Sequence, residues 1–299
     1  MHSFSRGPYT FDVVDTALPD GGGEVVLLLH GFPQDSSTWS NLSPILNSRG
    51  FRCVAPNLRG YSPGARPVSR FDYRIEELVA DVVALIEATG AERVHVVGHD
   101  WGGAVAWVLA RVRPDLVSTL TVLSTPHPDA LAWAMPRSRQ AMRSWYMFFM
   151  QLPVIPEAVF EAALRRGYTR KVGLPLEFAT AYERRLGEPD AIRGGINWYR
   201  GMFLPQSRAT RQARTAGATD GSGTKPDHGA RRGSVGPVSV PTTYVWGRHD
   251  PYLGGTAARR THTLVDADYR FVELDAGHWL PECHPEEVAE AIIARATGA

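Results

Sequence analysis

One acidic residue stands where a strand-like run meets a helix-like run, in the sequence VHVVGHDWGGAVAW at positions 94–107. Asp100 lies between Gly98 and Gly102, which let the backbone turn where a Cβ would clash, and Gly103 lets the next helix pack closely. This spacing is typical of a nucleophile elbow, whose central side chain projects beside the amides of a helix N-terminus. The alternative is that Asp100 only caps the helix that begins at Trp101.

A carboxylate at such a corner predicts different chemistry from the more usual serine. A carboxylate is ionised at neutral pH without the help of a base. Its attack on a carbonyl would give only a labile anhydride, whereas its attack on an electrophilic saturated carbon gives an alkyl ester that water can cleave. Serine attack on the same carbon would give a dead-end ether. Asp100 therefore predicts displacement at saturated carbon followed by ester hydrolysis.

The hydrolytic step needs a base, an orienting acid and an oxyanion hole. His278 follows a strand-like stretch in DAGHWLPEC, and Asp250 follows another in WGRHDPYLG. His278 would take a proton from water while Asp250 fixes its tautomer, with Asp129 in TPHPD as an alternative acid. The loop HGFPQDSSTW follows VVLLL, so the amides of Phe32 and Trp101 are the expected oxyanion donors.

Alternating strand-like and helix-like segments must position these residues. Short β-branched runs bounded by turn residues predict strands buried on both faces. Apolar residues from Ile75 to Ile86 keep the spacing of an amphipathic helix, and the segment after Asp100 predicts another. Such alternation favours an α/β class with a mostly parallel sheet flanked by helices. The predicted strands are 9–15, 25–30, 51–55, 94–98, 119–124, 242–247 and 269–274.

The pattern divides the chain into a core and an insertion. Between about 131 and 204 strand signals give way to aromatic-rich helical segments, the first of them at 138–152. We expect these to form an all-helical cap over the C-terminal edge of the sheet, where ligands bind in open α/β folds. Residues 205–237 have too few large apolar side chains to offset their ordering entropy, which predicts a disordered linker. The core would then comprise residues 1–130 and 238–299.

Composition excludes several classes of function. The net charge of +1 gives no field that would attract nucleic acid or a membrane surface. Cys53 and Cys283 give no disulfide framework, and no thiol occupies the elbow. The N-terminus lacks a signal-peptide core, and the longest apolar runs fall far short of the roughly 20 residues that cross a bilayer. We expect a soluble cytoplasmic monomer or homodimer, with no metal ligand spacing among its histidines and no cofactor.

Four motifs together resemble the epoxide hydrolases of the α/β-hydrolase superfamily: HGFP, GHDWGG, GRHDP and GHW. The resemblance covers nearly the whole chain except about 205–237, and it implies an α/β-hydrolase fold with an inserted helical cap. Haloalkane dehalogenases share the aspartate elbow. Phe32-Pro33 resembles the epoxide hydrolase form, however, whereas dehalogenases commonly have Asn there. Asn57 departs from the Asp expected in relatives, in a loop that we interpret as structural.

The resemblance also implies two cap tyrosines that hydrogen-bond the epoxide oxygen. NWYR at 197–200 is similar to the second tyrosine motif, which gives Tyr199, and WYMFFMQLP at 145–153 resembles the first, which gives Tyr146. Tyr168 is the alternative for the first position. Ring opening creates an alkoxide that a phenol can stabilise and protonate, whereas halide departure needs no proton. Each tyrosine could instead be an ordinary packing residue.

We therefore expect an epoxide hydrolase that converts a lipophilic epoxide into a vicinal diol through an ester on Asp100. One alternative is a haloalkane or haloacid dehalogenase that uses the same Asp100 and His278. Another is a non-catalytic protein that only binds ligands on this fold. The substrate pocket is expected to include His30, Pro33, Trp101, Phe149 and Trp198.

Overall fold

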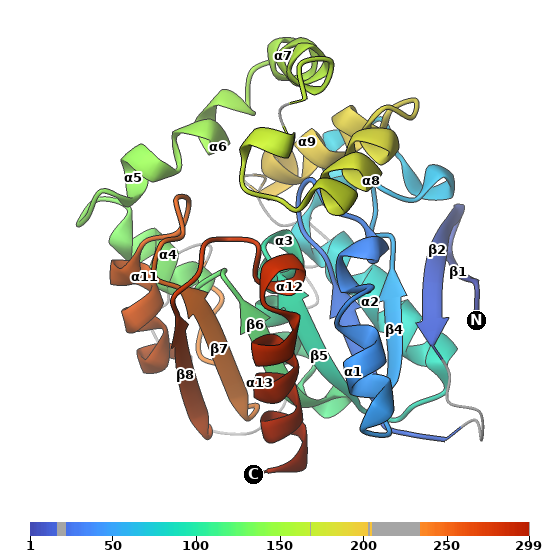
Figure 1. Ribbon diagram of the computed structural model, residues 1–299, viewed down its shortest axis with the longest axis vertical. Helices are drawn as coiled ribbons and strands as arrows, with labels where there is room; N and C mark the ends of the chain where they lie inside the picture. Colours follow the sequence, from blue (N-terminus) through green and yellow to red (C-terminus); the bar gives the residue numbers. More distant parts are fainter. Residues whose placement is uncertain (17–21, 168, 203, 205–233, 299) are drawn as a thin grey trace, which may run out of the picture.

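The protein is described by a computed structural model over residues 1–16, 22–167, 169–202, 204 and 234–298. Its strands are β1 (Ser3–Arg6), β2 (Tyr9–Thr16), β3 (Val25–Leu29), β4 (Arg52–Pro56), β5 (Val94–His99), β6 (Val117–Leu123), β7 (Thr242–Gly247) and β8 (Tyr269–Leu274). They form one sheet in the order β1-β2-β4-β3-β5-β6-β7-β8 (Figure 1). β2 is antiparallel to both of its neighbours, β1 and β4, and the remaining neighbours, from β4 to β8, are parallel. The predicted α/β class is confirmed.

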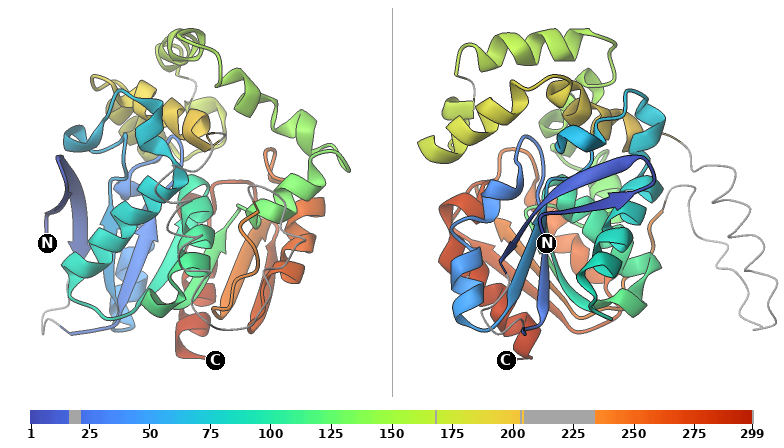
Figure 2. Two further views of the ribbon diagram at one scale, coloured as in Figure 1. Left: turned by 180° about the vertical axis from the view of Figure 1, so that it is seen from behind. Right: turned by 90° about the vertical axis from the view of Figure 1, so that its right-hand side faces the viewer.

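The central strands are buried on both faces because helices cover both sides of the sheet. In β3, Val26 and Leu28 join one apolar cluster, and Leu27 and Leu29 join the other. Since side chains alternate along a strand, a run of five apolar residues supplies both clusters. The cluster of Val26 is covered by α1 (Ser43–Ser48) and α13 (Pro285–Thr297), and the other by α2 (Ile75–Thr89) and α3 (Trp101–Val112), which lie on opposite faces (Figure 2).

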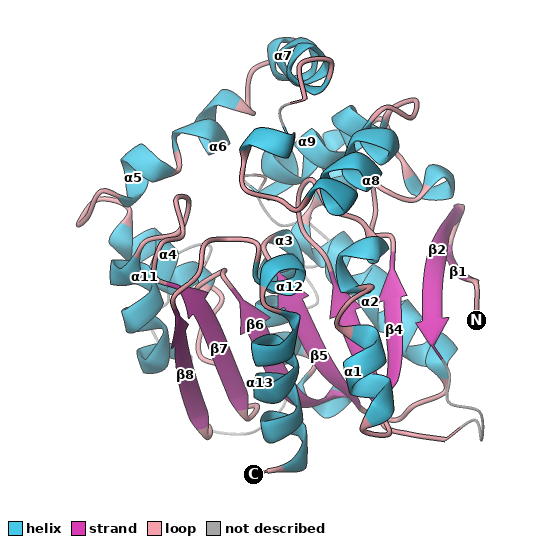
Figure 3. Ribbon diagram, viewed as in Figure 1, coloured by secondary structure: helices cyan, strands magenta, loops and turns pink. Residues whose placement is uncertain are grey.

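Between β6 and β7 the chain forms a series of helices, called the helical block below. It lies over the end of the sheet toward which the parallel strands point (Figures 1 and 3). The predicted helical segment 138–152 divides into two short helices that part at Ser144. The block comprises α4 (Pro128–Ala134), α5 (Gln140–Arg143), α6 (Trp145–Phe149), α7 (Ile155–Leu164), α8 (Leu176–Leu186) and α9 (Ala191–Met202).

The seven predicted strands are confirmed, each end within two residues of its expected place. The sequence pattern does not predict β1, because β1 is a four-residue edge strand with only one buried side chain. The expected boundary at 130/131 falls within α4. Residues 205–233 of the predicted linker lie outside the described residues. Its last four residues are held in place, because Asp129 accepts hydrogen bonds from the Ser234 hydroxyl and from two amides of this segment.

The remaining helices follow the last two strands: α11 (Gly255–Arg260) after β7 and α12 (Leu280–Cys283) after β8. No helix in the described part of the chain is long and apolar enough to cross a membrane.

Candidate active site

Asp100 occupies the turn between β5 and α3 in a strained backbone conformation, with φ 50° and ψ −117°. Residues other than glycine rarely adopt a positive φ, and such strain clusters at functional sites. Gly98 and Gly102 make the turn possible. A Cβ on Gly102 would lie 2.1 Å from the carbonyl oxygen of Leu29, and one on Gly98 would lie 2.5 Å from the carbonyl oxygen of Gly102. The turn thus has the geometry that the sequence predicts for an elbow.

Backbone amides hold the Asp100 carboxylate. The Phe32 N–H donates to Oδ1 at 2.8 Å, and the Trp101 amide also hydrogen-bonds the carboxylate. The side chain is 17% exposed, so it is accessible only from the cavity beside it. Burial raises the pKa of Asp100, although His278 and the two amides oppose this effect. The amides of Phe32 and Trp101, which are the expected oxyanion donors, therefore both hydrogen-bond the Asp100 carboxyl group. They would stabilise the oxyanion formed when an ester of this group is hydrolysed.

His278 stands between two carboxylates. Its Nδ1 lies 2.7 Å from Asp250 Oδ2, and its Nε2 lies 3.8 Å from Asp100 Oδ2. Asp250 Oδ1 accepts hydrogen bonds from the amides of Tyr252 and Leu253, which fix the acid in place. Burial lowers the pKa of His278, but Asp250 and Asp100 outweigh it and the net shift is upward. Because Nδ1–H donates to Asp250, Nε2 is the nitrogen left to act as a base.

Asp129 does not take part in this arrangement. Its carboxylate accepts hydrogen bonds from Ser234, Val235 and Gly236, and it contacts no catalytic candidate. The alternative that Asp129 is the orienting acid is wrong, because Asp250 fills that position.

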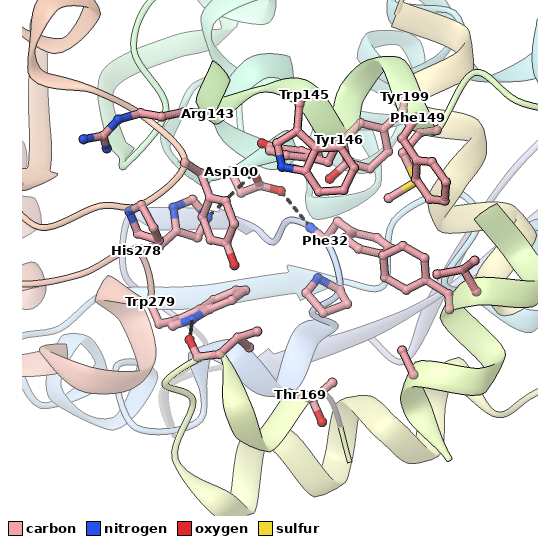
Figure 4. A pocket seen from close by; sticks show the side chains of 18 of the residues that line it. Phe32, Asp100, Arg143, Trp145, Tyr146, Phe149, Thr169, Tyr199, His278 and Trp279 are labelled. Carbon is pink, nitrogen blue, oxygen red and sulfur yellow. Dashed lines mark hydrogen bonds and ion pairs between the residues drawn. The ribbon is translucent and has the colours of Figure 1, made fainter. Parts of the chain in front are cut away.

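A cavity of about 550 Å³ opens over Asp100 and His278. Figure 4 shows Asp100 between His278 and Phe32, with Tyr146 and Tyr199 on the side of the helical block. The lining is mostly apolar, which suits a lipophilic ligand. The lining side chains include Pro33, Met142, Trp145, Phe149, Met150, Val159, Phe160, Val172 and Trp279.

Two of the five expected pocket residues, Pro33 and Phe149, line this cavity, and the other three do not. The His30 ring is fully buried, where its Nε2 accepts a hydrogen bond from the Leu58 amide. The Trp198 indole N–H donates to the carbonyl oxygen of Arg59. The Trp101 ring packs behind Tyr199, with ring centroids 4.8 Å apart. These three side chains are buried in the core and not in the cavity wall.

The two tyrosines predicted from the resemblance reach the cavity from different helices, Tyr146 from α6 and Tyr199 from α9. Their ring centroids lie 5.9 Å apart in an edge-to-face arrangement. Burial raises the pKa of Tyr199 well above its usual value, and the negative charge of Asp100 adds to this effect. The phenol therefore keeps its proton and can act as a donor. Tyr168, the alternative to Tyr146, lies outside the described residues.

Sequence reasoning missed two aromatic residues that contact the base. The ring centroids of Tyr252 and Trp279 each lie 5.0 Å from that of His278. Both stand next to predicted residues in the sequence, Tyr252 two positions after Asp250 and Trp279 directly after His278. That proximity is the signal that could have identified them. Asn57 is structural as expected, since its Oδ1 accepts a hydrogen bond from the Ser36 amide.

Comparisons with known proteins agree with this description. A family model described as alpha/beta hydrolase fold matches residues 24–285. The chain is 32% identical to Epoxide hydrolase A of Mycobacterium tuberculosis (strain ATCC 25618 / H37Rv), with 96% of this chain and 94% of the relative covered. It is 30% identical to AB hydrolase superfamily protein YfhM of Bacillus subtilis (strain 168), with coverage of 91% and 89%.

Solved structures show the same relationship. A structure described as "Novel epoxide hydrolases belonging to the alpha/beta hydrolases superfamily in metagenomes from hot environments" superposes with a TM-score of 0.76 at 26% identity, covering 97% of this chain and 95% of that one. The predicted fold and the resemblance to epoxide hydrolases are confirmed.

Proposed function

Because this chain belongs to the alpha/beta hydrolase fold family, we propose that it is an epoxide hydrolase that converts a lipophilic epoxide into a vicinal diol. The observation that carries the proposal is the pairing of a carboxylate at the elbow with the phenols of Tyr146 and Tyr199, which reach the same mostly apolar cavity from the helical block. Relatives named as epoxide hydrolases that align over nearly the full chain support it. In this proposal the helical block acts as a cap that brings Tyr146 and Tyr199 over Asp100.

In the first step, an Asp100 carboxylate oxygen attacks a ring carbon of the epoxide. The carbon–oxygen bond of the ring breaks, and its electron pair goes to the ring oxygen. Tyr146 and Tyr199 hydrogen-bond that oxygen, and one of them supplies the proton. Since Phe32 N–H holds Oδ1, Oδ2 is the oxygen that we assign to the attack. The product is a hydroxyalkyl ester of Asp100.

In the second step, water cleaves this ester. His278 Nε2 removes a proton as the water oxygen attacks the carboxyl carbon of Asp100. Negative charge then develops on Oδ1, where the Phe32 amide already donates a hydrogen bond and the Trp101 amide is the second donor that we assign. Collapse of the tetrahedral intermediate breaks the bond between the carboxyl carbon and the ester oxygen. The diol leaves with a proton from His278. The carboxylic acid left on Asp100 gives up the second proton of the water, which returns through solvent to the tyrosine that donated a proton in the first step, so the carboxylate and the phenol are both restored.

Esterification also prepares the base for this step. The charge of Asp100 is one of the effects that raise the pKa of His278 in the free protein. An ester carries no such charge, so the pKa of His278 falls when the intermediate forms. The imidazole thus becomes less basic, and more readily neutral, when the intermediate needs a neutral base.

Product analysis on purified protein tests the proposal. Styrene oxide and a longer aliphatic epoxide would be offered beside 1-chlorobutane and fluoroacetate, with Asp100→Ala as the matched control. We expect diol from the epoxides with the natural protein and none above background with the control. Halide release without diol would show a dehalogenase instead. Stoichiometric binding of the epoxides without turnover, by folded protein, would show a non-catalytic binding protein.

A further inference from the structure

A buried chain of hydrogen bonds runs behind the candidate active site through Gln34, His99 and Glu282. Gln34 Nε2 donates to Glu282 Oε1 at 2.6 Å, and Gln34 Oε1 lies 2.8 Å from His99 Nδ1. At its other end, His99 Nε2 lies 2.9 Å from the carbonyl oxygen of His278. Gln34 and His99 are fully buried and Glu282 is 4% exposed. The chain therefore connects a buried acid to the backbone of the base.

The partners of His99 require a hydrogen on both ring nitrogens. A backbone carbonyl only accepts, so His99 Nε2 must donate to the His278 oxygen. Gln34 Oε1 also accepts the Gly31 N–H at 2.7 Å, which fixes this end of the amide as the oxygen. His99 Nδ1 must then donate to Gln34. A ring with two N–H groups is an imidazolium.

The opposite orientation of the Gln34 amide fails on the same contacts. It would place the NH₂ group against the Gly31 N–H, so that two donors face each other in a buried site. It would also place the amide oxygen against Glu282 Oε1, which is acceptable only if that carboxyl group is protonated. With Gln34 Oε1 toward the Gly31 N–H and His99, and Gln34 Nε2 toward Glu282, each donor faces an acceptor.

The hydrogen-bond donors around Glu282 favour its ionised form and oppose the effect of burial. Oε1 accepts hydrogen bonds from Gln34 Nε2 and from the Tyr182 hydroxyl at 2.8 Å. The Thr38 hydroxyl lies 2.5 Å from that of Tyr182 and can donate its one hydrogen to it. Donors that converge on one carboxylate oxygen stabilise the anion. Oε2 has no hydrogen-bond partner in the described part of the chain, so Oε1 takes all of these bonds.

Burial disfavours a positive charge on His99 when Glu282 is neutral, and a negative charge on Glu282 when His99 is neutral. It lowers the pKa of His99 well below its usual value and raises the pKa of Glu282. His278 and His30 also disfavour a cation at His99, although burial lowers the pKa of His30 to about 4 and keeps it neutral. A lone cation or a lone anion here would be strongly destabilising, whereas a pair bridged by one amide balances the charge.

We propose that His99 is a buried imidazolium and Glu282 a buried carboxylate, and that Gln34 joins them into one positioning unit for the hydrolytic step. Gln34 holds the Gly31 amide, next to the oxyanion donor Phe32. His99 holds the His278 carbonyl, and Tyr182 ties α8 of the helical block to Glu282. The unit thereby fixes the distance between the oxyanion donor and the base. Its catalytic role rests on the proposed function, whereas its protonation state does not.

Nitrogen NMR of the full-length protein tests the protonation state directly. The ring nitrogens of histidine would be labelled with ¹⁵N, and His99 assigned by comparison with His99→Gln. At pH 7.5 we expect both ring nitrogens of His99 to carry a proton, and Glu282→Gln to remove one of these protons. An unprotonated His99 nitrogen in the natural protein would overturn the proposal, whether or not the protein hydrolyses epoxides.

An exchange of charge tests the positioning role. Gln34→Glu alone sets two carboxyl groups against each other, and Glu282→Gln alone removes the counter-charge of His99. Gln34→Glu/Glu282→Gln moves the charge and can keep the hydrogen bond between positions 34 and 282 with donor and acceptor exchanged. The Tyr182 hydroxyl would then accept from the amide at position 282 and donate to Thr38. In single-turnover assays we expect each single variant to slow ester hydrolysis by about 10-fold, more than it slows ester formation, and the double variant to recover to within about 3-fold.

Recovery of this kind distinguishes a charge pair from general damage to the fold. If the double variant is as slow as the two single effects combined, or if ester formation and hydrolysis slow equally, the positioning role is wrong. Should the single variants fail to fold, a folded double variant with a protonated His99 supports the unit, and an unfolded one contradicts it.

Discussion

His278 Nε2 lies 3.8 Å from the nearest Asp100 oxygen, while His278 Nδ1 lies 2.7 Å from Asp250. The imidazole is thus held firmly by Asp250 and stands back from the nucleophile. A carboxylate needs no base to attack, so a direct bond between the two side chains has no function in ester formation. In the proposed mechanism, this separation leaves Nε2 facing the carboxyl group that water attacks in the second step. The arrangement is therefore consistent with the proposal that Asp100 and His278 act in succession.

Replacing the base should trap the intermediate. His278→Gln leaves the Asp100 carboxylate and the two tyrosines in place, so ester formation should continue while ester hydrolysis slows by about 10²- to 10⁴-fold. Intact-mass spectrometry after addition of epoxide should show a gain of one epoxide mass per chain. Peptide mapping should place that mass on Asp100.

Asp100→Asn is the matched control for this experiment, because it preserves the shape of the side chain but removes its charge. It should show no added mass. Slow diol release by His278→Gln with no adduct at any time would mean that water attacks the epoxide directly and that the ester mechanism is wrong.

The pH dependence of hydrolysis should differ from the titration of the free base. In the free protein the pKa of His278 is raised above 6.5 despite burial, through Asp250 and Asp100. Only neutral His278 can accept a proton from water, so the rate should fall as pH drops through its pKa. Because the ester removes the charge of Asp100, that pKa is lower in the intermediate. The acid limb of ester hydrolysis should therefore lie at lower pH than the midpoint of His278 in the free protein.

Two measurements locate these midpoints. An NMR titration gives the midpoint of His278 in the free protein, and the decay of preformed ester after a pH jump gives the acid limb of the hydrolytic step. Asp250→Asn removes the effect that most raises the pKa, so it should move both midpoints to lower pH and slow the reaction. Coincident midpoints in the natural protein would show that the charge of Asp100 does not control the base.

Loss of the phenol of Tyr146 or of Tyr199 should slow ring opening. Tyr199→Phe and Tyr146→Phe each remove one donor to the developing alkoxide, which should cost about 10- to 100-fold in the rate of ester formation. The double variant should lose more than either single one, and ester hydrolysis should change little. Tyr269→Phe is a matched control, because this half-buried tyrosine in β8 does not line the cavity. Equal loss in both half-reactions would indicate a packing role for the tyrosines.

The sequence specified the sheet because its central strands are short β-branched runs between turn residues, and each such run fits a position with helices on both sides. The candidate catalytic residues could be predicted for a related reason. Asp100, Asp250 and His278 all follow strands, and the ends of parallel strands meet at one edge of the sheet. Local pattern and chain order therefore contained the information for these three positions.

The pocket wall could not be predicted in the same way. Three aromatic residues that stand close in the sequence to catalytic candidates were expected in the pocket wall: His30, Trp101 and Trp198. All three are instead buried in the core. Which face an aromatic side chain takes depends on the packing of the helical block, and periodicity carries no information about that packing. Glu282 was missed because it is a single acid in an ordinary helical sequence. Its role becomes visible only when Gln34 and Tyr182 are placed beside it.

A buried ion pair between Arg59 and Asp81 is the basis of the last prediction. Arg59 donates to both oxygens of Asp81, with distances of 2.7 Å and side-chain exposures of only 1% and 5%. The carbonyl oxygen of Arg59 accepts the indole N–H of Trp198, which precedes Tyr199 in α9. The pair therefore supports the helix that carries one of the two phenols.

Asp81→Ala would leave the Arg59 guanidinium buried without its counter-charge, which should lower the free energy of unfolding by about 3–5 kcal/mol. Thermal unfolding should show a clear drop in the midpoint. Asp115→Ala breaks the exposed pair with Arg113 and is the matched control, with no expected change in the midpoint. If Asp81→Ala unfolds like the natural protein, Arg59 must find another acceptor and the support for α9 lies elsewhere. If the loss of stability is as predicted, the variant should also bind epoxide less tightly, because Tyr199 would no longer be held over Asp100.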